Sequence, residues 1–302
     1  MSKQIKQSKN AIALLITVLF VIVITVAIGF GLRQVNEASS LVKNESFMYQ
    51  SNILVEDIIS VLQNSPDVAR VADTNSSDEL FNLLSQASFI PFESSGFEIV
   101  LKLHSARAKF NPNNLNEQTS NALREYMSIN MVNNQYVDIL LDTINGVKID
   151  NSYNSRIFDE NPYLFRDYIV SRKHLEQVND FFTKEYNDNS LKNVAFENLF
   201  YFGSDKNSSV DLNYATQEVW ELMLGCQKER AEFLALNAGV YSDVESLDLS
   251  NGELENLQRF KTSFSEPILF VEIEIQQSDN RAHISFEYDI ENKKGSNFVY
   301  EI

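Results

Sequence analysis

Residues 11–32, AIALLITVLFVIVITVAIGFGL, constrain this chain more than any other stretch, because they contain no charged residue. A helix of this length extends about 33 Å, and the hydrocarbon core of a bilayer is about 30 Å thick. The apolar part of a secretory signal peptide is shorter. We therefore predict a membrane-spanning helix. Lys3, Lys6 and Lys9 precede it, so the positive-inside rule leaves the short N-terminus in the cytoplasm and the bulk of the chain outside.

The helix is expected to continue beyond the membrane as an amphipathic segment. Apolar residues recur every seven positions on one face, at Leu41, Met48, Val55 and Leu62. This spacing indicates a helix packed against another part of the protein. Asn64, Ser65 and Pro66 are expected to end it. The pattern predicts a single helix over 12–64, transmembrane to about residue 32.

After a polar loop and a short helix around Leu80–Ala87, alternating residues predict a β-hairpin of Phe97–Leu103 and Ala106–Phe110, closed at His104 and Ser105. Helical periods fill 117–264, with candidate helices at Glu117–Met131, Gln135–Ile144, Pro162–Val170, Lys173–Phe182, Ala215–Leu224, Lys228–Ala238, Ser242–Leu247 and Gly252–Phe260. Strands return at Ile268–Ile275, His283–Tyr288 and Phe298–Ile302. Because strands lie on both sides of the helical region, that region is predicted to be inserted into one sheet.

The expected fold is therefore α+β. A long N-terminal helix, transmembrane and then amphipathic, packs on a small antiparallel β-sheet, and a large all-α domain is inserted into that sheet. The formal net charge of −17 argues against nucleic-acid binding, which needs a basic surface. The single cysteine, Cys226, excludes an intramolecular disulfide and is expected to be buried as a small apolar residue.

No enzyme signature is found in the sequence: Walker A, G-x-G-x-x-G, G-x-S-x-G, H-E-x-x-H and C-x-x-C are all absent. The three histidines, His104, His174 and His283, have no metal-ligand spacing among them. We therefore predict no catalytic residue and no cofactor.

One acidic loop, DTINGVKIDNSYNSRIFDE over 142–160, offers oxygen ligands of the kind that calcium prefers. Its candidate ligands are Asp142, Asp150 and Asp159. The spacing differs from that of an EF-hand loop, so a solvated turn is favoured over a calcium site.

Two segments match N-x-S/T with an acidic residue two positions before the asparagine, at Asn75 and Asn207. They are candidate N-glycosylation sites in predicted loops. Two polar turns rich in asparagine and serine explain the pattern equally well.

The N-terminus, KNAIALLI over 9–16 after a short leader with lysines, resembles the type IV pilins and pseudopilins. It is most similar to the K-type minor pseudopilin of type II secretion, the general secretion pathway protein K family. Most pilins carry a glutamate five residues into the mature chain, and that family lacks it; here Ile16 stands there, counted from Ile12. Further segments match in order: 108–115 (AKFNPNNL), 140–142 (LLD), 171–175 (SRKHL) and 210–219 (VDLNYATQEV). In the last, Asn213 or Thr216 is expected to cap a helix.

The resemblance implies a non-enzymatic subunit at the tip of the type II secretion pseudopilus. Such a subunit caps or initiates the fibre that exports folded proteins across the outer membrane. Implied partners are minor pseudopilins I and J, the other pseudopilins of the fibre, prepilin peptidase and the inner membrane, with the bulk of the chain in the periplasm. The peptidase would cut between Ala11, where the family has glycine, and Ile12.

The resemblance also divides the chain. Its parts are a leader (1–11), the long helix (12–64), the first part of a pilin-like domain (65–116), an inserted helical domain (117–264) and the closing strands (265–302). Two other functions remain open: a tip minor pilin of a type IV pilus or DNA-uptake pseudopilus, and a single-pass anchored periplasmic binding or sensor domain.

Overall fold

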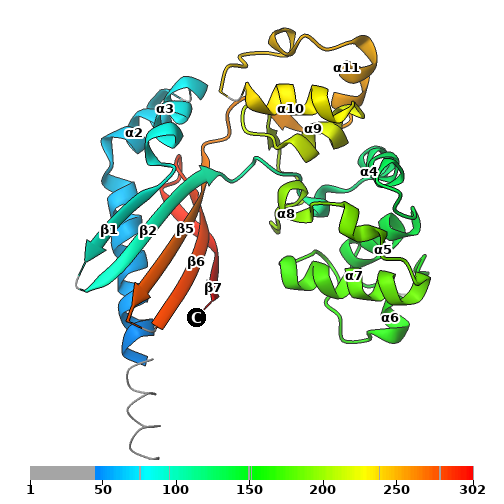
Figure 1. Ribbon diagram of the computed structural model, residues 1–302, viewed down its shortest axis with the longest axis horizontal. Coiled ribbons are helices and arrows are strands. Elements are labelled where there is room, and N and C mark those ends of the chain that lie inside the picture. The colour runs from blue at the N-terminus through cyan, green and yellow to red at the C-terminus, as the bar shows by residue number, and fades with distance from the viewer. Residues whose placement is uncertain are drawn as a thin grey trace, which may run out of the picture.

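The computed structural model describes residues 45–74, 76–94, 96–148, 150, 152–237, 239–278 and 280–301. They form two units (Figure 1): a sheet unit, residues 45–105 and 268–301, and a helical block, residues 106–267. The predicted leader and membrane helix, with Ala11, Ile12 and Ile16, lie outside the described residues, as does Asn75. Within the described ranges, no helix combines the length and the apolar character that a membrane crossing needs.

The first described element of the sheet unit is a helix over residues 45–64, called the stem helix here. Its buried face carries Phe47, Val55, Ile58 and Leu62. Val55 and Leu62 thus lie on the packed face, as the heptad spacing predicts, but Met48 is 46% exposed because Phe47 takes the inward position. The helix ends at residue 64, as expected, and Pro66 starts the next helix.

Two short helices follow the stem helix. The segment expected to be a polar loop instead forms α2 (Pro66–Thr74), which buries Val68 and Val71. Apolar residues three positions apart suffice to bury one face of a helix in a mostly polar sequence. The second helix, α3 (Ser77–Ala87), buries Leu80 and Leu84 and confirms the short helix predicted there.

The sheet is antiparallel with the order β1-β2-β5-β6-β7. Its strands are β1 (Ile90–Ser94), β2 (Phe97–Ser105), β5 (Ile268–Gln277), β6 (Asn280–Asp289) and β7 (Lys294–Glu301). The stem helix runs along one face of this sheet (Figure 1), and the apolar residues of alternate strand positions form one core with it. The predicted α+β fold with a small antiparallel sheet is therefore confirmed for the described residues.

The predicted hairpin of 97–103 and 106–110 is wrong. β2 extends through His104 to Ser105 and forms a hairpin with β1, which precedes it in the chain. Its other neighbour is β5, which follows the helical block, and Ser105 lies opposite Leu269. Gly96, at φ +81°, lies in the turn between β1 and β2. Pro91 weakened the strand pattern of β1, and no local pattern identifies a partner as distant as β5.

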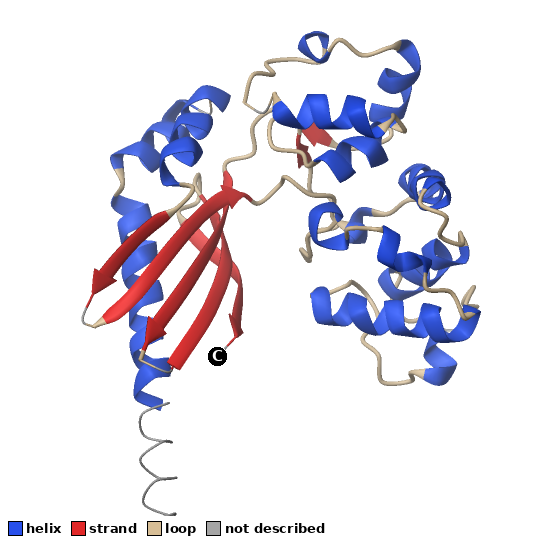
Figure 2. Ribbon diagram, in the orientation of Figure 1, coloured by secondary structure: helices blue, strands red, loops and turns tan. Residues whose placement is uncertain are grey.

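The chain leaves the sheet at the end of β2, forms the helical block and returns to the sheet at β5 (Figure 2). The block is therefore inserted between two strands that are neighbours in the sheet. Its helices are α4 (Glu117–Ile129), α5 (Gln135–Ile144), α6 (Ile157–Glu160), α7 (Arg172–Tyr186), α8 (Phe196–Leu199), α9 (Gln217–Leu224), α10 (Lys228–Leu236) and α11 (Asn251–Leu257), with short 3-10 turns η1 (Pro112–Asn114), η2 (Ser190–Asn193) and η3 (Glu245–Leu247). The helix expected at 162–170 is replaced by turns.

An all-α domain was expected here, but the block is not entirely helical. Two short strands, β3 (Val210–Asp211) and β4 (Thr262–Ser263), pair in parallel. The predicted cap of the following helix is confirmed at Thr216, whose hydroxyl accepts the Val219 N–H at 3.3 Å. Apolar residues of the block, with Trp220 and Tyr136 fully buried among them, form a core separate from that of the sheet unit.

Candidate functional site

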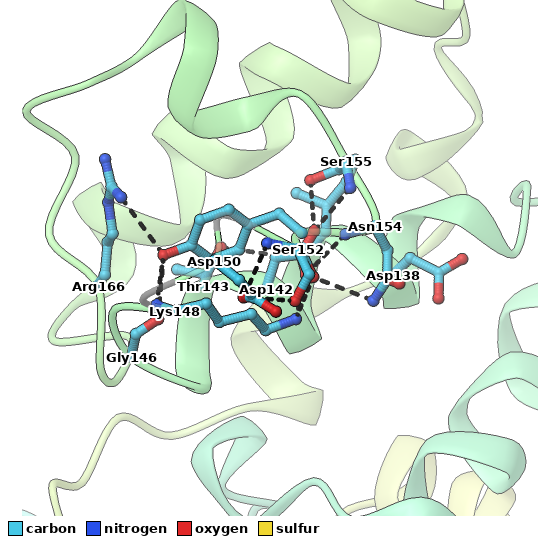
Figure 3. A network of polar contacts seen from close by, with 12 residues as sticks. Asp138, Asp142, Thr143, Gly146, Lys148, Asp150, Ser152, Asn154, Ser155 and Arg166 are labelled. Carbon is cyan, nitrogen blue, oxygen red and sulfur yellow. Dashed lines mark hydrogen bonds and ion pairs between the residues drawn. The ribbon is translucent and has the colours of Figure 1, made fainter.

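The buried carboxylate of Asp142, near the end of α5, organises the acidic loop that follows (Figure 3). Its Oδ2 accepts the Ser155 N–H at 2.7 Å and the Ser155 hydroxyl at 2.8 Å. Its Oδ1 accepts the Asn154 N–H at 3.1 Å, and the Lys148 ammonium lies 3.5 Å from it. Asp142 is fully buried, so this is neither a solvated turn nor an open set of ligands. Its oxygens fasten the loop.

The other two calcium candidates serve local roles. Asp150 accepts the Ser152 N–H at 3.2 Å and the Ser152 hydroxyl at 2.8 Å, and these hydrogen bonds hold the pKa of Asp150 below its usual value. Asp159 is exposed on α6. Within the described ranges, no three His, Cys, Asp or Glu side chains lie close enough together to hold a metal ion. Asp142, Asp150 and Asp159 are therefore not brought together.

Tyr153 makes further contacts within the same loop. Its hydroxyl accepts the Lys148 N–H at 2.9 Å and lies 3.3 Å from the Arg166 guanidinium. The Arg166 guanidinium also lies 4.1 Å from the centre of the Phe158 ring. The acidic loop is thus a closed network of internal contacts with a structural role.

A second polar cluster lies where the helical block meets the sheet unit. Arg107, just after β2, donates from Nη2 to Glu287 Oε2 on β6 at 3.0 Å, and both side chains are buried. The ring of Tyr201, after α8, lies 4.9 Å from the Arg107 guanidinium. Burial raises the pKa of Tyr201 and keeps it neutral. The cluster joins the block to the outer face of the sheet, which is the face opposite the stem helix.

β3 holds both ends of the block together at this junction. The Asp211 N–H donates to the Arg107 carbonyl at 2.9 Å, and the Leu212 N–H donates to the Ser263 carbonyl at 2.8 Å. The fully buried Asp211 side chain also accepts the N–H groups of Asn213 and Glu266, each at 3.0 Å. Burial raises the pKa of the Asp211 carboxyl to about 7, although these two hydrogen bonds act to lower it.

Two of the histidines meet on the outer face of the sheet. His104 Nε2 on β2 lies 3.4 Å from Glu272 Oε2 on β5, and His283 Nε2 on β6 lies 4.0 Å from Glu272 Oε1. The hydrogen bond with His104 lowers the pKa of Glu272. No sequence pattern predicts this grouping, because only the register of the strands brings the two histidines to one carboxylate. His174, the third, is buried in the helical block.

Asn207 lies in an exposed turn, where its N–H donates to Asp205 at 2.9 Å and its carbonyl accepts from Lys261 at 2.7 Å. The hydroxyl of Ser209, the third residue of that motif, is hydrogen-bonded to Glu266. Cys226 is half-buried, and burial raises the pKa of its thiol to about 11. A thiol with this pKa is a poor nucleophile at neutral pH.

No protein-family model matches the chain, and no curated protein matches its sequence. Among solved structures, the chain is similar to one in the crystal structure of the GspK–GspI–GspJ complex from the type 2 secretion system of enterotoxigenic Escherichia coli. The TM-score is 0.54 and the sequence identity 10%, over 86% of this chain and 97% of that chain. A match of this extent includes residues of both units. The resemblance drawn from the sequence motifs is thus confirmed at the level of the fold.

Proposed function

We propose that this protein is a K-type minor pseudopilin, a structural subunit without enzymatic activity at the tip of a type II secretion pseudopilus. One observation carries the proposal. A large helical block interrupts two neighbouring strands of a sheet that packs on a stem helix, and this arrangement is shared over most of the chain with a component of a secretion pseudopilin complex.

The position of the block supports placement at the end of a fibre. The block lies to one side of the sheet unit, with α9, α10 and α11 level with α2 and α3 and with α5, α6 and α7 level with the strands (Figure 1). Pseudopilin fibres stack subunits along their long helices, so a block in this position would overlap the subunit above. The top subunit has none above it. Ile16, which stands where most pilins have a glutamate, also supports the top position. The topmost subunit has no subunit above it whose N-terminal amine a glutamate would neutralise.

The partners proposed for this role are minor pseudopilins I and J, the other pseudopilins of the fibre, and the prepilin peptidase that removes the leader. The proposed location is the inner membrane, crossed once by residues 12–32, with the two described units in the periplasm. The formal charge of −17 favours a protein partner over nucleic acid.

Excision of the block tests the proposal, and the structure fixes how to make it. Ser105 lies opposite Leu269, and the Ala106 N–H donates to the Ile268 carbonyl at 2.9 Å. Residues 107–267 can therefore be replaced by Asn-Gly, which forms a tight two-residue turn between the opposed residues Ala106 and Ile268. Excision also uncovers Glu287, so no unpaired charge stays buried.

We expect the shortened protein to insert in the membrane, while export of folded proteins falls to the level of a strain lacking the gene. The control is the same strain with the full chain restored. Unchanged export and unchanged fibre length with the shortened protein would refute the tip role. Normal export with defective DNA uptake or piliation would instead assign the chain to a pilus-type fibre.

A further inference from the structure

The two edge strands of the sheet differ in how open they are to pairing. β1 has five residues and contains Pro91, which has no backbone N–H, and the exposed acid Glu93. These are devices that keep an edge from pairing with another strand. β7 has eight residues and no proline. Its outer side offers unpaired backbone N–H and C=O groups along the described strand.

A groove runs between β7 and the stem helix, with a volume of about 610 Å³. Its walls are largely apolar and are formed by Met48, Asn52, Val55, Glu56, Ile59, Phe298 and Tyr300. Met48 and Tyr300 are 46% and 45% exposed. Groups that are apolar and this accessible at an open sheet edge are typical of a binding surface.

The groove is held in shape by the core behind it. The Phe298 ring stacks on the buried Phe286 ring, with their centres 4.9 Å apart. Tyr300 lies opposite Ile284, on the same side of the sheet as the stem helix. The Gln63 side chain at the end of that helix donates to the Lys293 carbonyl at 3.0 Å, just before β7 begins. A partner would therefore meet a surface that is already formed.

Charge distinguishes the two ends of this surface. Lys294 begins β7 and Glu301 ends it, and Glu56 lines the groove. A complementary segment would carry a basic residue that reaches Glu56 or Glu301, and an acidic residue at the Lys294 end. The open backbone of β7 is complementary to an extended strand and not to a helix, whose own backbone groups are already paired.

We propose that β7 receives a strand of a neighbouring minor pseudopilin, which adds a sixth strand to the sheet and places alternate apolar side chains in the groove. The inference rests on the proposed function for the identity of the partner, and it adds where that partner docks. Backbone hydrogen bonds would provide affinity, and the groove and its charges would provide the choice of partner.

The test compares two matched substitutions in the full chain, each co-expressed with pseudopilins I and J from the same secretion operon and purified in detergent. Tyr300→Asp places a charge in the groove beside β7. Ile90→Asp places the same charge at a similarly exposed position on the opposite edge strand, 36% exposed against 45%. We expect Tyr300→Asp to reduce the recovered complex at least tenfold, as for loss of a central contact, and Ile90→Asp to leave it unchanged.

Hydrogen exchange on the unmodified complex gives an independent measurement. Strand addition should slow exchange of backbone amides within 294–301 relative to the free chain, whereas a docked helix would leave these amides unchanged. An intact complex with no slowing in β7 would overturn the inference and leave the proposed function standing, as would loss of the complex with Ile90→Asp alone. Failure of the unmodified chain to bind either pseudopilin would overturn both.

Discussion

Arg107 and Glu287 form a buried ion pair although 180 positions separate them in the sequence: Arg107 Nη2 lies 3.0 Å from Glu287 Oε2, and each side chain is 9% exposed. Arg107 belongs to the segment that leaves the sheet, and Glu287 belongs to the sheet itself. The pair therefore fixes how the helical block sits on the sheet unit.

Breaking this pair should be costly. Glu287→Gln leaves the Arg107 guanidinium buried without its counter-charge, and we expect a loss of about 3–5 kcal/mol in the free energy of unfolding. The double variant Arg107→Met/Glu287→Gln should recover part of that loss, because no unpaired charge remains. Urea unfolding of the single and double variants measures both effects. Additive losses would contradict a direct coupling between the two residues.

Asp142 should matter for stability more than its acidic neighbours do. Asp142→Ala removes a buried carboxylate that accepts the N–H groups of Asn154 and Ser155, and we expect unfolding to become easier by about 2–4 kcal/mol. Asp150→Asn is the control, since that side chain is exposed and should leave the unfolding midpoint unchanged. Equal effects of the two substitutions would show that the loop does not depend on Asp142.

Calcium should have no effect on unfolding. Because the Asp142 oxygens already accept protein hydrogen bonds, a metal ion would have to displace them. We expect the thermal midpoint to be the same with EGTA as with millimolar calcium. A higher midpoint in calcium that disappears in Asp142→Ala would show that the loop rearranges to bind the ion.

Asp211 should make stability depend on pH. Its pKa is about 7 in the folded protein and 3.8 for a free carboxyl, so between these values the folded state binds more protons than the unfolded state. The free energy of unfolding should then fall as pH rises from about 4 to about 7 and level off above that. Asp211→Asn should lower stability at every pH but remove this slope. Unfolding curves from pH 4 to 8 measure it, and an unchanged slope in the variant would assign it to another group.

The predicted removal of the leader between Ala11 and Ile12, outside the described residues, can be tested directly. Purified from a host with prepilin peptidase, the protein should begin at Ile12; from a host without it, the leader should remain. Mass spectrometry of the two preparations gives the answer and would also reveal a glycan at Asn75 or Asn207. An intact leader in both hosts would favour a permanently anchored protein.

Local patterns predicted most of the longer helices and the strands near the C-terminus, but they missed α2 and β1 and placed a helix at 162–170 where the structure has turns. Gln135–Ile144 was predicted with the bounds that the structure has, because apolar spacing and flanking polar residues mark both ends of a helix. The pairing of the strands was harder to predict from the sequence. Nothing near Phe97–Ser105 in the sequence identifies β5 as its partner, and the incorrect hairpin arose from seeking that partner nearby.

The same limit applies to the polar sites. Asp142 was singled out for its oxygens, but whether they face solvent, a metal or the chain's own N–H groups depends on a loop that folds back over thirteen positions. The grouping of His104, Glu272 and His283, and the pairing of Arg107 with Glu287, depend entirely on strand register and on how the block meets the sheet. Composition and spacing carry no information about either.

The hold of β3 on both ends of the block also bears on the order of folding. Before β2 can pair with β5, an unfolded chain must close a loop that runs from residue 106 to residue 267, at an entropic cost of about 5 kcal/mol. A block that has already folded brings Arg107 and Ser263 to opposite sides of β3 and so delivers the two strands side by side. If the block folds first, the pairing of β2 with β5 becomes a local one, and the inserted block is then the template on which the sheet closes.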